Sequence, residues 1–243
     1  MIKHSFWLTF RIVAFIIGYY VLSMYIDDIY IIIGVVVISI PMIIYNYINK
    51  GKYEYLLEIL CDPSKYTEII KTKYIKKDES IYQLCLAYGY VYSGDYDNAL
   101  LAINKVDHLV VEKSLKHNLM YYIVMLKLAY NNQDLDEYNI LLLKLQKIEL
   151  DKNNKIDIKI FDIPVYMLEK KYTEVIELLH ELIPLQRKRF ILMELEYYLA
   201  LAYLEVGNKI DAIAVLEFVS KEKYHLIYNK LASELLETVR NPV

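Results

Sequence analysis

The sequence predicts an all-α protein with two parts, an N-terminal helical hairpin in a membrane and a larger domain of stacked helix pairs. Three observations predict it. Glycine and proline are scarce, at six and five in 243 residues, and no strand-like runs recur with turn signals. Residues 12–48 form two apolar runs. Beyond residue 79, apolar residues and turn residues recur at a nearly constant spacing, which indicates tandem helical units.

The hairpin is predicted from uncharged runs on either side of Asp27 and Asp28. Residues 29–48 are twenty residues without a charge, and twelve of them are Ile or Val. At about 1.5 Å per residue, such a helix spans about 30 Å, the thickness of the hydrocarbon core of a bilayer. Residues 12–26 are fifteen uncharged residues, and that run reaches the required length only if the helix begins near residue 5. We therefore expect spanning helices at about 5–26 and 29–48, within a hairpin of residues 1–50.

Three other structures compete with a spanning hairpin. A cleaved signal peptide would need small residues after the first run, but Ser23-Met24-Tyr25 stands there and a second apolar run follows at once. A buried hairpin of a soluble protein is a second alternative, although twenty uncharged residues are long for it. A helix lying in the membrane interface would need a polar face, which neither run has. Length and pattern favour the spanning hairpin.

Basic residues predict the orientation of the hairpin. Lys3 and Arg11 flank its start and Lys50 and Lys52 flank its end, whereas its tight loop carries two aspartates. Because Lys and Arg stay on the cytoplasmic side, we expect Arg11, Lys50 and Lys52 at the inner membrane interface. Both termini and the domain of residues 51–243 are then cytoplasmic, and the protein is a two-pass protein of the cell membrane.

Composition limits the functions open to the larger domain. After residue 50 the chain has 25 basic and 29 acidic residues, and this acidic balance argues against a general nucleic-acid binder. The two cysteines, Cys61 and Cys85, have neither metal-binding nor redox spacing, and we interpret them as buried thiols in a reducing compartment. The abundance of Ile, Lys, Asn and Tyr is typical of an AT-rich genome, which favours a bacterial source.

Two stretches of the larger domain carry the same residue types at the same offsets. They are Leu86-Ala87-x-x-Tyr90, Gly94 and Ala99 in the first stretch, and Leu199-Ala200-x-x-Tyr203, Gly207 and Ala212 in the second. Each stretch reads as a helix, a glycine turn and a second helix that packs closely through its alanine. The sequence therefore predicts two copies of one helix–turn–helix unit.

Two weaker copies lie between these stretches. Gln133 and Lys170 take the turn position in them, and Tyr138 and Val175 stand where the other copies have alanine. The four turn positions, beginning at Gly94, are then 39, 37 and 37 residues apart. A nearly constant spacing across four turns indicates tandem repeats more strongly than any single motif does.

This pattern resembles the tetratricopeptide repeat over about residues 80–220. The family's usual period is about 34 residues, so the long helices expected at 109–132 and 186–206 carry extra turns. Ala replaces the usual Gly of the Leu-Gly pair, Gln83 and Glu196 stand at the usual Trp position, and the closing Pro is missing. The resemblance implies a right-handed α-solenoid with a concave face. An amphipathic helix at 223–238 is expected to cap it, and a further helix is expected at 64–75, begun by Asp62-Pro63.

No residue pattern typical of catalysis, metal binding or cofactor binding is present. Glu177-x-x-His180-Glu181 has the spacing used in di-metal bundles, but such a site needs a second copy on a facing helix. Gly-rich phosphate loops and Gly-x-Ser-x-Gly elbows are missing. We predict a protein that is not an enzyme and has no catalytic residue, metal or cofactor. The basic run 186–189 could contact an acidic partner or lipid, or it could simply be a solvated helix start.

The concave face implied by the resemblance is the candidate binding site. Tyrosine offers a broad contact area with little rotamer entropy to lose, which suits capture of a peptide. The alternative is that these tyrosines fill the core of a chain that has 26 of them. The partner-binding groove is predicted to contain Tyr88, Tyr92, Lys127, Tyr130, Asn131, Met167, Tyr197 and Glu205.

A repeat array with an anchor and no catalytic set predicts a membrane-anchored scaffold or adaptor. It would hold a protein or peptide partner at the cytoplasmic face, with residues 5–48 in the bilayer. The alternative is that the hairpin itself acts, as a membrane-embedded subunit of a transport or secretion complex or as an immunity factor. Gly18 and Gly34 would then allow close helix packing in an oligomer or against a partner.

Overall fold

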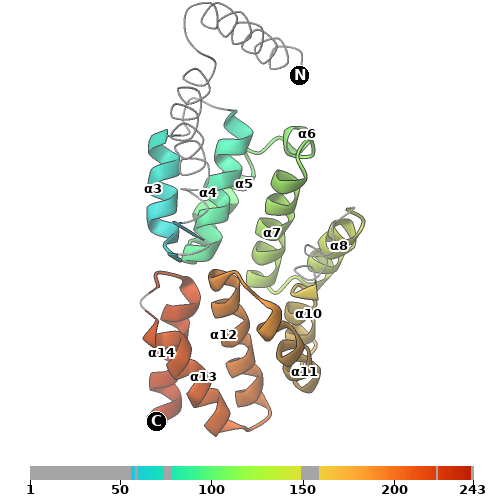
Figure 1. Cartoon of the computed structure of the whole chain (residues 1–243). Coiled ribbons are helices and arrows are strands. Elements are labelled where there is room, and N and C mark those ends of the chain that lie inside the picture. The colour runs from blue at the N-terminus through green and yellow to red at the C-terminus, as the bar shows by residue number, and fades with distance from the viewer. Residues whose placement is uncertain (1–55, 58–59, 74–77, 149–158, 223, 242–243) are drawn as a thin grey trace, which may run out of the picture. The chain divides into compact units, whose positions relative to one another are not determined.

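The computed structural model describes residues 56–57, 60–73, 78–148, 159–222 and 224–241. Every regular element in these residues is a helix, so this part of the protein is all-α, as predicted (Figure 1). The chain divides into two compact units, Met1–Lys52 and Tyr53–Val243, and all described residues belong to the second. The predicted hairpin of residues 5–48, with Arg11, Lys50 and Lys52, lies outside the described residues. Among the described helices, none is both long enough and apolar enough to cross a membrane.

The helices of the second unit pack mainly on their neighbours along the chain. Neighbours that pack include α3 on α4, α4 on α5, α7 on α8, and then each helix from α10 to α14 on the next. In chain order the helices are α3 Pro63–Lys73, α4 Glu79–Ser93, α5 Tyr96–Ile103, α6 His108–Val111, α7 Leu115–Asn131, α8 Leu135–Gln146, α10 Asp162–Leu168, α11 Tyr172–Leu182, the 3-10 helix η1 Ile183–Leu185, α12 Arg189–Glu205, α13 Lys209–Lys221 and α14 Ile227–Arg240.

Two of the predicted long helices differ from the structure. The helix expected at 109–132 is broken, because α6 ends at Val111 and α7 begins at Leu115. Ser114 lies between them with extended backbone, at φ −132° and ψ 120°, a conformation that the residue before a helix commonly adopts. The helix expected at 186–206 begins only at Arg189. Each helix start is therefore determined by nearby residues. The apolar periodicity continues through residues 112–114 and did not predict the break between α6 and α7.

The four predicted turn positions are confirmed. Gly94, Gln133, Lys170 and Gly207 have positive φ angles of 79°, 57°, 59° and 80°. In each turn, the N–H of the next residue donates to the carbonyl five residues earlier. The four distances, for the N–H groups of Asp95, Asp134, Lys171 and Asn208, are 3.0, 3.0, 2.9 and 2.8 Å. This bond and the left-handed residue together form the Schellman ending of a helix.

The residues that follow each turn also repeat. Asp95, Asp134 and Asn208 each accept a hydrogen bond from the backbone N–H three residues later, which caps the second helix of the pair. Lys171 stands at the fourth such position and makes no capping bond. Five residues after the turn, the predicted close-packing side chains Ala99, Tyr138, Val175 and Ala212 are buried. The described part of the chain thus contains one helix–turn–helix unit four times.

The core joins helices from both ends of the array that runs from α4 to α14. Its largest buried cluster contains Val91 of α4 and Val124 of α7 together with Phe190 of α12 and Tyr228 of α14. The helix predicted at 223–238 corresponds to α14, which begins only at Ile227 and ends at Arg240, and its start packs on the first turn of the array. A Cβ atom on Gly94 would lie 2.6 Å from Cδ1 of Ile227. The last helix of the chain therefore contacts the first repeat as well as its own neighbours.

Candidate functional site

A pocket of about 370 Å³ opens among helices from both ends of the repeat array, and we call it the tyrosine pocket. It is defined by the residues that line it, which are Tyr96, Leu126, Lys127, Tyr130, Asn131, Gln133, Tyr138, Phe161, Pro164, Leu168, Glu194, Tyr197, Tyr198, Leu201, Ile227, Tyr228 and Leu231. They come from α5, α7, α8, α10, α12 and α14 and from the loops beside α7 and α10. Six of them are tyrosines, so the wall combines aromatic surface with hydroxyl groups.

A buried ion pair stands in the wall of the tyrosine pocket. Nζ of Lys127 lies 2.6 Å from Oε1 of Glu194, and the two side chains are only 10% and 8% exposed. The same ammonium group donates to the hydroxyl of Tyr228 at 3.0 Å. It also lies 4.7 Å from the centre of the Tyr92 ring and 5.4 Å from that of Tyr228, within the range of a cation–π contact.

Packing between distant helices creates this pair. Lys127 is on α7, Glu194 on α12 and Tyr228 on α14, and 67 and 101 residues separate Lys127 from the other two. All three side chains are largely buried, since those of Lys127 and Glu194 are 10% and 8% exposed and Tyr228 is 6% exposed. An unpaired charge there would carry a large desolvation cost, and the bonds to the partner groups offset much of it. The contact thus links α7 with the last helices of the repeat array.

The tyrosine hydroxyls of the pocket stay protonated at neutral pH. Burial raises the pKa of Tyr96 to about 12, and the negative charge of Glu194 adds to this shift. Burial also raises the pKa of Tyr130 to about 12, against a hydrogen bond with Tyr198 that lowers it. The pKa values of Tyr198 and Tyr228 are raised well above the ordinary value, again chiefly by burial. These phenols therefore serve as neutral hydrogen-bonding groups, not as acids or bases.

The structure brings four of the predicted groove residues together, since Lys127, Tyr130, Asn131 and Tyr197 all line the tyrosine pocket. Tyr92 is buried beneath it, with its ring against the ammonium group of Lys127. The ring of Tyr88 meets that of Tyr92 edge to face, with 5.2 Å between their centres, and stays outside the lining.

Two further predicted residues lie away from the pocket. Met167 is on α10 and packs, partly buried, against the apolar cluster of α11 and α12. Glu205 is exposed at the last position of α12. Desolvation of the phenol raises the pKa of Tyr172, and the charge of Glu205 and a hydrogen bond from the phenol to it add to this shift.

Glu194 and Tyr228 are the residues that sequence reasoning missed. Glu194 follows Phe190 and Met193 in a segment whose other members are apolar, and a single acid in such a segment signals either an exposed edge or a buried partner. Tyr228 stands in the helix that was interpreted only as a polar-backed cap. Their partner, Lys127, is too distant in sequence for spacing to reveal it.

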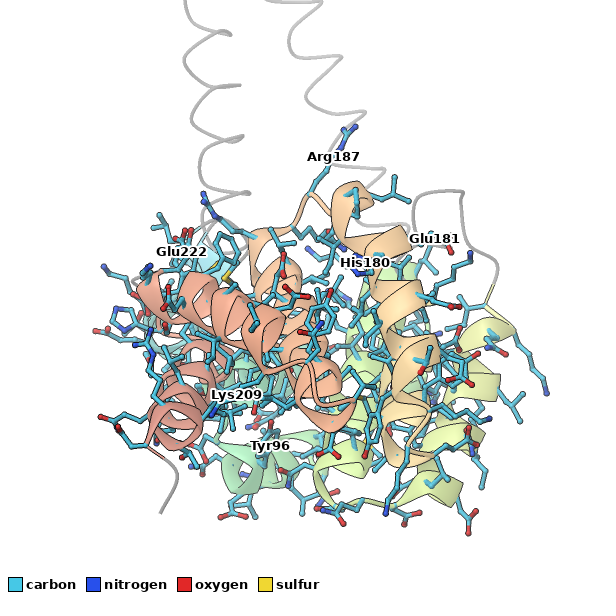
Figure 2. All side chains as sticks on the ribbon, turned by 90° about the horizontal axis from the view of Figure 1, so that it is seen from below. Tyr96, His180, Glu181, Arg187, Lys209 and Glu222 are labelled. Carbon is cyan, nitrogen blue, oxygen red and sulfur yellow. The ribbon has the colours of Figure 1, made fainter. Side chains whose placement is uncertain are left out.

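The residues of the His180 motif and of the basic run contact other side chains, and Arg189 of the basic run lies 3.9 Å from the carboxylate of Glu222. Nε2 of His180 lies 3.0 Å from the hydroxyl of Tyr203, and Glu181 pairs with Lys159. In the part of the chain that the structure describes, no three His, Cys, Asp or Glu side chains are grouped to hold a metal ion. Figure 2 shows Arg187 projecting from the segment before α12, away from the helices.

Comparison of the chain with protein-family models, with curated proteins and with solved structures gives no match. The candidate site therefore depends on its own geometry.

Proposed function

We propose that the protein is a membrane-anchored helical-repeat adaptor that holds a segment of a protein partner in the tyrosine pocket, at the cytoplasmic face of the membrane. The observation that carries the proposal is the tyrosine pocket itself, with its buried Lys127–Glu194 pair. Its volume of about 370 Å³ is at the lower end of the range for ligand sites, and it suits one or two side chains of a peptide.

The chemistry of the wall supports a peptide as the occupant. Tyr130 and Tyr197 offer ring faces and hydroxyls, Asn131 offers an amide, and Leu201 and Leu231 offer apolar surface. Rigid aromatic side chains beside adaptable polar groups are typical of surfaces that bind peptides and proteins. A fixed ion pair adds directionality, because its geometry is set before any partner arrives.

The repeat architecture and the anchor belong to the same proposal. Four left-handed turns with the same helix-ending hydrogen bond, 37 to 39 residues apart, support a tetratricopeptide-like solenoid, in which stacked helix pairs bury a continuous core. The twenty uncharged residues at 29–48 support a hairpin that holds this array at a bilayer. A tag after Val243 that is accessible only from the cytoplasm would agree with this topology, and an externally accessible tag would contradict it.

Site-specific photo-crosslinking tests the adaptor function. A photoreactive benzoylphenylalanine replaces Tyr197, which lines the pocket, in the full chain produced in living cells. The matched control replaces Tyr203, which is six residues later on α12 and outside the lining. We expect adducts with one defined partner segment at position 197 and few or none at 203. Equal labelling at both positions, or no adduct at 197, would contradict the proposal.

Exchange of the hairpin separates the adaptor from the alternative in which the hairpin acts. Residues 12–48 are replaced by an unrelated spanning hairpin, and the crosslinking at position 197 is repeated. An adaptor should keep the same adduct. If the adduct disappears when the hairpin is replaced, the result would favour a membrane-embedded subunit of a transport or secretion complex, or an immunity factor.

A further inference from the structure

Two long helices start at segments that combine an exposed leucine with basic residues. Residues 113–116 contain the start of α7 and residues 185–188 precede α12, and neither segment has an acidic residue. Their leucines are 45% and 54% exposed. We call six residues of these segments the leucine–lysine patch, and they are Lys113, Leu115, Lys116, Leu185, Arg187 and Lys188. Exposed apolar side chains beside cationic ones are typical of surfaces that lie on a membrane.

The two segments lie close together, although 72 residues separate Lys116 from Lys188. Partial burial lowers the pKa of the Lys116 ammonium, and the positive charge of Lys188 lowers it further. Burial also lowers the pKa of His117, and the charge of Lys116 adds to this shift, against the charge of Asp78. Asp78 itself caps α4. The starts of α7 and α12 therefore bring positive charges together, and negative charge at this place would offset their repulsion.

The positive charge of the leucine–lysine patch extends to side chains without an acidic partner. Within the part of the chain that the structure describes, Lys113 and Arg187 form no ion pair, and the acid next to Lys113, Glu112, bonds His108 at 3.0 Å. Arg187 projects away from the helices (Figure 2). The first turns of α7 and α12 contain no acidic residue and lack a side-chain cap, so the positive ends of both helix dipoles add to the patch.

The chain enters the described domain near the start of α12. Burial raises the pKa of the Cys61 thiol to about 11, and the charge of Arg189, the first residue of α12, opposes this rise. Arg189 is balanced by Glu222 at 3.9 Å, so we leave it out of the patch. The uncharged run predicted to span the bilayer ends at residue 48, and the connection to Cys61 covers at most about 45 Å when fully extended. The start of α12 is therefore within reach of the bilayer, which favours lipid over a soluble acidic partner.

We propose that the leucine–lysine patch lies on the anionic lipid surface of the membrane, with Leu115 and Leu185 in the interface and the four basic side chains on lipid phosphates. This inference rests on the proposed function, because the anchor brings the bilayer to the patch. Each basic residue near an anionic surface favours the contact about fivefold. A tethered domain meets lipid at a high effective concentration, so a few such contacts suffice. They fix the direction in which the tyrosine pocket faces.

Spin labels on the full chain in lipid nanodiscs test the inference. A nitroxide is attached to Leu185→Cys; the natural Cys61 and Cys85 are buried, so the new thiol is labelled preferentially. The matched control is Ile210→Cys, an exposed apolar residue beside Lys209 near the opposite end of α12. The nanodiscs contain phosphatidylcholine alone or mixed with anionic phosphatidylglycerol. Electron paramagnetic resonance measures how readily oxygen, which concentrates in lipid, and a water-soluble nickel chelate reach each label.

On anionic nanodiscs we expect the label at position 185 to be protected from the nickel chelate and open to oxygen, and the label at 210 to stay in water. Arg187→Gln together with Lys188→Gln should lower the ratio of lipid-bound to water-exposed label at 185 about thirtyfold, from about fivefold for each charge. High salt should act in the same direction, because it screens the charges. Lys170→Gln with Lys171→Gln, two exposed basic residues at the third turn, should leave the ratio unchanged. Circular dichroism checks that each variant is folded.

Three results would overturn the lipid inference. The first is a label at position 185 that the nickel chelate reaches equally on anionic and neutral nanodiscs. The second is equal protection at positions 185 and 210. The third comes from sodium phosphate added to neutral nanodiscs: a spectral change at 185 there, with none on anionic lipid, would assign the patch to a soluble anion.

The outcomes also separate this inference from the proposed function. The adaptor function is judged by the crosslinks at positions 197 and 203, which do not depend on the patch. If the chain does not insert into nanodiscs, the anchor in the proposed function fails, and the labelled chain is mixed with vesicles of the same two compositions. Protection at 185 on the anionic vesicles alone would still support the leucine–lysine patch as a lipid surface, and its absence would overturn it.

Discussion

The first and fourth repeats have the same local structure in different surroundings. Gly94 and Gly207 end α4 and α12 with φ angles of 79° and 80°, and Ala99 and Ala212 are fully buried five residues later. A Cβ on Gly94 would collide with Ile227, whereas a Cβ on Gly207 would meet no atom within 4 Å. The turn chemistry is thus the same, and only the first turn is covered by another helix.

This difference shows how a local repeat becomes a binding site. Because α14 packs on the first turn, helices from both ends of the repeat array surround the tyrosine pocket. The residue two positions after the turn reflects the same contrast. Tyr96 lines the pocket in the first repeat, and Lys209 is exposed in the fourth; both are labelled in Figure 2. Two turns with the same local structure can therefore differ in function, because different helices pack on them.

The largest expected difference is between alanine substitutions of the two turn glycines. Gly207→Ala should cost about 1 kcal/mol, the strain of an L-residue at positive φ. Gly94→Ala should cost about 3 kcal/mol, because the collision with Ile227 adds to that strain. Urea denaturation of the full chain, followed by circular dichroism, measures both. Equal costs would mean that α14 does not cover the first turn.

Alkaline pH should destabilise the protein through Tyr96, which the fourth repeat lacks. The pKa of Tyr96 is raised to about 12 in the folded protein, from an ordinary value of 10.0. Between these values the unfolded chain loses this proton and the folded protein keeps it, so the free energy of unfolding falls as pH rises. Tyr96→Phe should reduce that slope by about 1.4 kcal/mol per pH unit. Urea titrations between pH 10 and pH 12 test this, and an unchanged slope would contradict it.

The caps that follow the two turns should contribute alike. Asp95→Ala and Asn208→Ala each remove a capping hydrogen bond from the backbone N–H of Asn98 and Asp211 respectively, together with a side-chain hydrogen bond to the same residue, and each should cost about 1 kcal/mol. These hydrogen bonds are exposed, so the surroundings that distinguish the glycines do not enter. Thermal denaturation of both variants measures this, and a cost several times larger at Asp95 would show that the first turn differs locally as well.

The smallest effect is expected at the third turn, where Lys170 takes the glycine position. Its φ of 59° is strained for lysine, and its side chain is exposed. Lys170→Gly should stabilise the protein by about 0.5 kcal/mol, because relief of strain exceeds the entropy that glycine loses on folding. Lys144→Gly, inside α8, should instead cost about 1 kcal/mol. Denaturant midpoints distinguish these opposite signs.

Local features of the fold were predictable, because they depend on residues close in sequence. The first and fourth turns follow from glycine, a capping residue and alanine at fixed offsets, and the second and third turns follow from their regular spacing relative to these two. The break between α6 and α7 was missed, since an apolar pattern continues across residues 112–114 and only the capping tendency of Ser114 opposes it. The predicted membrane helices remain a prediction, because they lie outside the described residues.

The candidate site was only partly predictable. Lys127, Tyr130, Asn131 and Tyr197 were placed together by the inner-face positions of a repeat. The partners Glu194 and Tyr228 depend on how α14 returns to the first repeat, and no spacing in the sequence encodes that contact. Tyr92 was expected in the groove and is buried, because the cluster that contains it also includes residues of α12 and α14.

A double-mutant cycle between Gly94 and Ile227 tests most directly whether the last helix covers the first repeat and so completes the tyrosine pocket. The free energy of unfolding is measured for Gly94→Ala, Ile227→Ala and the double variant in the full chain. Ile227→Ala removes the atoms at 2.6 and 2.8 Å from the added Cβ, so the double variant should be more stable than the sum of the single costs by about 1 to 2 kcal/mol. Additive costs would contradict the contact between α14 and the first turn. They would also contradict a pocket enclosed by both ends of the repeat array.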